Sequence, residues 1–208
     1  MDISIVAGIL LLIFSLLCLG TGIYAFRRYS LTQSERLFAV GLAMCITAVS
    51  IACGAIDSLH VFPAFYLNWA WYTGTSLGFL CLFLSSVAKS NDQFQLLKRW
   101  SIIIAVVLIA VIALTPVFPA EPSGYAAVVL DSLRTIVCLL GFLRYITLYT
   151  SKGTRFSLLM CLAFLFIAIG YAALMPQLFD PTWNQLIVVG AFIRIIGAGF
   201  LFTAFVLG

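Results

Sequence analysis

Charged side chains are scarce in this 208-residue sequence, where only 9% of the residues are Asp, Glu, Lys or Arg. A soluble globular domain carries about 25%. Hydrophobic residues make up 64% of the chain, and the mean hydropathy is +1.19. Apolar runs of about 20 residues recur, each long enough to cross the hydrocarbon core of a bilayer. The composition therefore predicts an integral membrane protein in contact with the lipid bilayer, in the cell (plasma or inner) membrane.

Histidine is absent except for His60, and this excludes several kinds of chemistry. A haem held by two histidines is excluded, and the apolar segments hold no cluster of His, Asp or Glu of the kind that metalloenzymes need. They also show no Ser/His or Ser/Lys pair for a serine-based hydrolase. We therefore expect no enzyme activity, no cofactor and no metal. The net charge of +4 comes from basic residues in loops, so we expect no nucleic-acid partner.

The hydrophobic pattern predicts an all-α fold: a polytopic membrane protein with a single bundle of seven transmembrane helices. The connections are short, so residues 1–208 are expected to form one domain. The predicted spans are 3–26, 36–57, 64–88, 100–119, 124–149, 156–177 and 184–207.

The distribution of basic residues predicts how these spans are oriented. The loops after the first, third and fifth spans hold Arg27, Arg28, Arg36, Lys89, Lys98, Arg99, Lys152 and Arg155. The other three loops hold no Lys or Arg and carry Asp57, Glu121 and Asp180. Because cytoplasmic loops are enriched in Lys and Arg, the N-terminus is expected outside and the C-terminus in the cytoplasm.

Two further features concern partners. The sequence stops at Gly208 after an apolar segment without a basic residue, which leaves two explanations: a longer protein with a cytoplasmic signalling domain or partner after the last span, or a membrane protein that ends at the interface. Small-residue patches at 20–22 and 197–199 permit close helix contacts, either within one bundle or between copies in a homo-oligomer.

Four charged residues lie inside the predicted spans, where a charge at the bilayer centre costs roughly 2.5–3.5 kcal/mol. Arg144 is close enough to the inner interface for its side chain to reach it. Arg134 lies near mid-bilayer, and Asp131 precedes it by three residues, which places both on one helical face. Arg194 is expected at a similar depth in the last span. Such residues usually face the bundle interior or a wet cavity.

These charges predict a ligand site in the outer half of the bundle. Its predicted residues are Asp57, His60, Asn68, Tyr72, Asp131, Arg134 and Arg194. Further polar residues expected nearby are Tyr66, Thr73, Gln177, Asn184 and Gln185. An arginine fork suits a small anionic, polar or lipid-like ligand. The alternative is an internal salt-bridge network that fixes helix packing and binds nothing.

Three functions follow from this pattern. The first is a membrane sensor or receptor-type module that takes part in signal transduction, passing ligand binding to the cytoplasm through the last span. The second is a small-solute carrier or channel: Pro176-Gln177 resembles the PQ signature of small seven-helix sugar transporters. The third is a structural or accessory subunit of a membrane complex. Retinal binding is excluded, because the last span has no Lys for the Schiff base.

Overall fold

The computed structural model describes residues 3–59, 61, 66–117, 124–178, 183 and 185–207. These residues form seven α-helices and no strand, and each of the seven is long and apolar enough to span a membrane. The all-α prediction is therefore confirmed, and the chain is an integral membrane protein. The helices are α1 (Ile3–Thr32), α2 (Glu35–Ser58), α3 (Asn68–Val87), α4 (Asn91–Leu114), α5 (Gly124–Lys152), α6 (Arg155–Ala172) and α7 (Gln185–Leu207).

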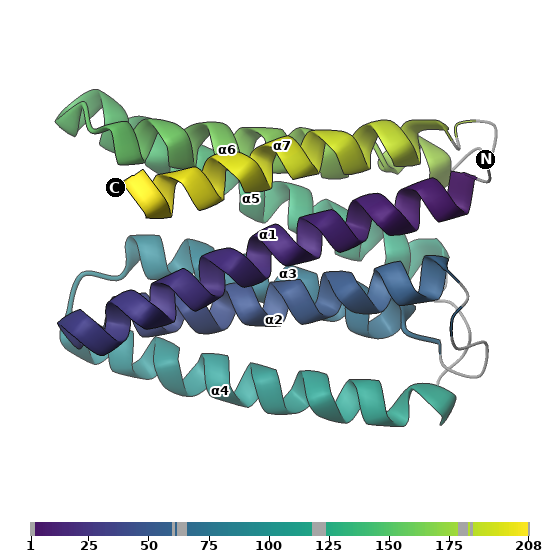
Figure 1. Ribbon diagram of the computed structural model, residues 1–208, viewed down its shortest axis with the longest axis horizontal. Coiled ribbons are helices and arrows are strands. Elements are labelled where there is room, and N and C mark those ends of the chain that lie inside the picture. The colour runs from purple at the N-terminus through teal and green to yellow at the C-terminus, as the bar shows by residue number, and fades with distance from the viewer. Residues whose placement is uncertain are drawn as a thin grey trace.

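Six of the helices form a closed ring, and α4 lies outside it. Helix α1 packs against α2 and α7, α3 against α2 and α5, and α6 against α5 and α7. Helix α4 packs on α2 and α3 and runs along the lower edge of the molecule in Figure 1. Its outer face carries exposed Ile103, Val106 and Ile109, which suits contact with lipid. The six ring helices therefore enclose the interior of the bundle, and α4 contributes few side chains to it.

The two ends of the bundle differ in charge. The turns α1–α2, α3–α4 and α5–α6 lie at the end where α7 finishes, opposite the start of α1 (Figure 1). We call this the basic end, because it carries Arg27, Arg28, Arg36, Lys89, Lys98, Arg99, Lys152 and Arg155. That this end faces the cytoplasm remains a prediction from the charges.

Polar groups in the core are mostly hydrogen-bonded to backbone carbonyls. Ser15 of α1 donates to the Ala48 carbonyl of α2 at 2.8 Å. Thr47 and Ser50 donate to carbonyls one turn earlier in α2, at 2.9 and 2.7 Å. Such bonds remove the cost of burying a hydroxyl. Most of the hydroxyl groups in the interior are thus satisfied locally, which sets apart the charged groups described below.

Helix α4 begins earlier than the sequence predicted. Residues 89–99 were expected to form a loop, but α4 starts at Asn91. The reason is a capping box: the Ser90 hydroxyl accepts from the Gln93 N–H at 3.3 Å, and the Gln93 side chain accepts from the Ser90 N–H at 3.3 Å. This motif satisfies free donors at a helix start even where the sequence is polar.

We expect the Ser90→Ala substitution to cost about 0.5–2 kcal/mol of stability, because it removes this cap. The loss should be local, and hydrogen exchange should quicken in the first turn of α4 and not in α6. A matched control is Ser151→Ala, whose exposed hydroxyl bonds only the Leu148 carbonyl in its own helix. Unchanged exchange in α4 would show that tertiary packing, and not the cap, holds this end.

Candidate functional site

Three charged side chains lie inside the ring, almost fully removed from solvent. Asp131 and Arg134 of α5 are 1% and 0% exposed, and Arg194 of α7 is 1% exposed. Because the two arginines are also the largest fully buried side chains of the described residues, they are the main polar feature of the interior.

Asp131 and Arg134 form an ion pair within one turn of α5. The Arg134 Nη2 atom lies 2.6 Å from Asp131 Oδ1, and Arg134 Nε donates to the Leu130 carbonyl at 3.4 Å. Residues three apart face the same side of a helix, so the pair needs no contribution from another helix. One of the two buried positive charges is therefore balanced locally.

Arg194 has no such partner among the described residues. Its Nε atom donates to the Gly190 carbonyl at 3.2 Å, one turn earlier in α7. The ion pairs in the described part of the chain join Lys98 to Glu35 and Arg134 to Asp131, and neither includes Arg194. Two arginines and one aspartate thus leave an excess of one positive charge in the interior.

Aromatic rings surround the two guanidinium groups. The Arg134 Cζ atom lies 4.9 Å from the ring centre of Tyr171 in α6, and the Arg194 Cζ atom lies 4.8 Å from the same centre. Arg134 also lies over Tyr72 at 4.6 Å and Trp71 at 5.1 Å, both in α3. An aromatic face attracts a cation, more strongly when both are desolvated. Tyr171 therefore joins the arginines of α5 and α7.

We call these six residues the arginine cluster: Trp71, Tyr72, Asp131, Arg134, Tyr171 and Arg194. Among its charged donors, Arg134 Nη1 and Arg194 Nη1 have no hydrogen bond of ordinary geometry with a described residue, while the Tyr171 hydroxyl interacts with both guanidinium groups. A buried donor without an acceptor costs roughly 1–3 kcal/mol, and more when it is charged. The cluster therefore has both the charge and the free donors to accept an anionic or strongly polar group.

The cluster lies in the half of the bundle away from the basic end. Trp71 is in the first turn of α3, and Tyr171 is the second-to-last residue of α6. Arg134 lies ten residues into α5 and Arg194 nine residues into α7, which corresponds to about 15 Å along each helix. The two arginines are thus at matching depth, close to the ends of α3 and α6.

Two of the other predicted site residues lie at the joint between α2 and α3. Asp57 is half-buried near the end of α2, and its carboxylate accepts from the Leu67 N–H at 3.3 Å. Asn68 is half-buried at the start of α3. The Asp57 bond ties α2 to α3. His60 and Asn184 lie outside the described residues.

The remaining expected neighbours have surroundings of their own, and their place in a site stays a prediction. Tyr66 and Gln185 are exposed, and the Thr73 hydroxyl donates to the Trp69 carbonyl of its own helix at 2.6 Å. Sequence reasoning missed Trp71 and Tyr171, because it sought polar groups and not aromatic faces. The signal was available: both aromatic residues lie in the outer parts of their spans, at the depth of the arginines.

Two of the cavities in the described part of the chain are large enough to consider, and no residue of the arginine cluster lines either of these two. One, of about 230 Å³, lies at the basic end; the other is an apolar groove of about 590 Å³ between α3 and α4. Among the described residues, no group of three or more His, Cys, Asp or Glu side chains is placed to hold a metal ion.

The comparisons with known proteins give no family for the chain. Neither the protein-family models, nor the curated protein sequences, nor the solved structures contain a match to it.

Proposed function

We propose that the protein is a membrane sensor whose arginine cluster binds a small anionic or polar molecule and transmits binding along α7. The observation that supports this is the shared ring of Tyr171, which holds arginines from two helices beside unused donors. An oxygen-rich ligand would supply the acceptors that Arg134 Nη1 and Arg194 Nη1 lack. Its negative charge would also balance the excess positive charge of the cluster.

Binding would change the packing of α7, because both guanidinium groups already lie over the Tyr171 ring. A ligand between the arginines must displace a guanidinium group from the Tyr171 ring, and Arg194 lies on α7. A ligand shifts a conformational equilibrium only by its different affinity for the two states. Here the difference would come from new hydrogen bonds in one state against the cation–π contacts in the other.

Helix α7 connects the cluster to the basic end on one face. Arg194 and Phe205 are 11 residues apart, about three turns, and both are buried. A rotation or shift of α7 at Arg194 would therefore move Phe205, which packs against Phe156 of α6 with ring centres 5.7 Å apart. This is the route by which an event in one half of the bilayer would reach the other.

The site can be tested with Trp71 as a fluorescent reporter, because its ring lies 5.1 Å from Arg134. Replacing Trp69, Trp100 and Trp183 with Phe leaves Trp71 as the single tryptophan. Acetate, benzoate and inorganic phosphate serve as probes. We expect a saturable change in emission with at least one, and Arg194→Gln should weaken its binding by about tenfold or more, because a charged hydrogen bond is lost.

The control is Arg155→Gln, which removes an arginine at the basic end of the bundle and should leave the emission titration unchanged. If none of the three probes changes the emission, or if Arg194→Gln binds as tightly as the parent, the sensor proposal fails. Transport of the bound probe into liposomes would instead favour the carrier. Purification only together with other chains would favour the accessory subunit.

A further inference from the structure

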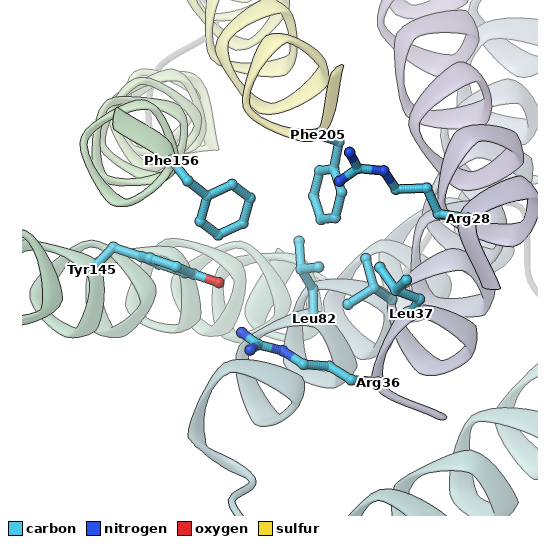
Figure 2. A pocket seen from close by; sticks show the side chains of 8 residues that line it. Arg28, Arg36, Leu37, Leu82, Tyr145, Phe156 and Phe205 are labelled. Carbon is cyan, nitrogen blue, oxygen red and sulfur yellow. The ribbon is translucent and has the colours of Figure 1, made fainter. Parts of the chain in front are cut away.

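The basic end holds a cavity that none of the residues of the arginine cluster line. This cavity, of about 230 Å³, opens among side chains from every helix of the ring (Figure 2). Its lining residues are Arg28 from α1, Arg36, Leu37 and Val40 from α2, Leu82 from α3, Tyr145 from α5, Phe156 from α6 and Phe205 from α7. The cavity therefore lies where the six helices converge, and not between one pair of helices.

One side of this cavity is polar and positively charged. Figure 2 shows the guanidinium groups of Arg28 and Arg36 extending from two different helices toward the opening. The Tyr145 side chain enters from α5 with its hydroxyl toward Arg36, and Tyr145 itself is only 4% exposed. Two guanidinium groups and a phenol thus present hydrogen-bond donors to one space.

No carboxylate lines the cavity, so the two arginines have no negative partner there. The nearest acidic residue in the sequence, Glu35, is paired with Lys98 at 3.0 Å. The Arg28 Cζ atom lies 5.5 Å from the Tyr24 ring centre. This aromatic contact does not neutralise the positive charge of Arg28. The net charge at the mouth is therefore positive.

The other side of the cavity is apolar. Phe156 packs edge-on against Phe205 at 5.7 Å and against Tyr145 at 6.3 Å, and Tyr145 stacks on Phe164 at 5.6 Å. Leu82 closes the space from α3 and is 2% exposed. These packed rings form an apolar wall, which a purely ionic ligand would not use.

We propose that this cavity binds a phosphate group attached to a short apolar segment. The fork of an arginine matches the oxygen atoms of phosphate, and two forks beside a tyrosine favour this group over a single carboxylate oxygen. The volume is below the roughly 300–1,000 Å³ of most drug-sized ligand sites, which limits the part of the ligand inside the cavity to the phosphate and a few carbon atoms. This inference does not depend on the proposed function of the arginine cluster.

Two sources can supply this chemistry: the headgroup of an anionic phospholipid, or a soluble phosphate ester. The basic end meets the interfacial region of the bilayer, where lipid phosphates lie. Arg28 and Arg36 are exposed enough to meet either one. Both sources use the same residues, and they are distinguished by the experiment.

The test uses the full chain in nanodiscs of phosphatidylcholine. In one arm phenyl phosphate is titrated and its binding followed by equilibrium dialysis; in the other, phosphatidic acid is added to the bilayer and its retention by the protein measured by native mass spectrometry. We expect saturable binding in at least one arm, and about a tenfold or greater loss in the Arg28→Gln/Arg36→Gln variant. Saturation by phenyl phosphate assigns the soluble source, and selective retention of phosphatidic acid assigns the lipid.

The matched control is Arg27→Gln/Arg155→Gln, which removes two arginines from the same end that do not line the cavity. This variant should bind like the parent. An equal loss in the control would show only a general effect of surface charge and would overturn the proposal. So would unchanged binding in the Arg28→Gln/Arg36→Gln variant, or no saturable binding in either arm. Both pairs of arginines are exposed, so both variants are expected to fold.

Discussion

Replacing Asp131 with Asn should lower the free energy of unfolding by about 3–5 kcal/mol, the usual cost of removing one partner from a buried ion pair. The size and shape of the side chain are nearly unchanged, so the loss is electrostatic. Asp131 carries the negative charge that lies 2.6 Å from Arg134, and Arg134 is 0% exposed. Without it, two positive charges remain in the interior with no negative group paired to either.

Equilibrium unfolding in mixed detergent micelles measures this effect. Asp92→Asn is the control, because it changes the same side chain at an exposed position in the first turn of α4. The double variant Asp131→Asn/Arg134→Met should recover much of the loss, since no unpaired charge of α5 remains. A loss below about 1 kcal/mol in Asp131→Asn would mean that water or another group already shields Arg134.

The same series separates a structural role for the cluster from a binding role. Replacing a buried ion pair with apolar residues of similar volume is often neutral or stabilising. The variant Asp131→Leu/Arg134→Met/Arg194→Leu therefore tests whether the charges are needed for folding at all. If the triple variant is stable but its Trp71 emission no longer changes when a probe is added, the charges serve binding and not folding. Collapse of the triple variant would instead favour a network that fixes helix packing.

The sequence predicted the fold well, because apolar runs in a membrane protein must pair their backbone groups internally. The predicted spans 124–149 and 184–207 correspond closely to α5 and α7. Helix ends were less predictable where polar residues continue a helix. One such case is α4, which starts at Asn91 although the predicted span started at residue 100. This start depends on the side chains of Ser90 and Gln93 and not on hydropathy.

The candidate site was predictable only in part. Asp131, Arg134 and Arg194 could be identified because a charge within an apolar span is costly and must face the interior. Their shared partner Tyr171 could not be identified, because α6 is apolar all round and its periodicity does not define which face points to the interior. The cavity at the basic end was missed for a similar reason. In the sequence Arg28 and Arg36 are ordinary residues beside a loop, and only the packing of six helices shows that they line a cavity.

Replacing Gly170 with Leu should destabilise the protein by about 1–3 kcal/mol or more, because it overpacks the contact between α6 and α7. A Cβ atom at Gly170 would lie 2.7 Å from the Gly190 carbonyl oxygen and would overlap the Arg194 side chain. A Cβ atom at Gly190 would meet the Gly170 carbonyl at the same 2.7 Å. The backbones of the two helices therefore touch beside Arg194, and a larger side chain must force them apart.

Gly199→Ala in α7 is the matched control, since a Cβ atom there meets nothing within 4 Å. It should not lower the unfolding free energy, because Ala in a helix interior is about 0.8–1 kcal/mol more favourable than Gly. The two variants also differ in what they do to the cluster. Separation of α6 from α7 would draw Arg194 away from Tyr171, which lies in α6 next to Gly170. Gly170→Leu should therefore weaken binding of any probe that titrates Trp71, whereas Gly199→Ala should not. Normal binding in a destabilised Gly170→Leu protein would mean that the position of α7 does not control the site, and that binding at the cluster cannot be transmitted by that helix.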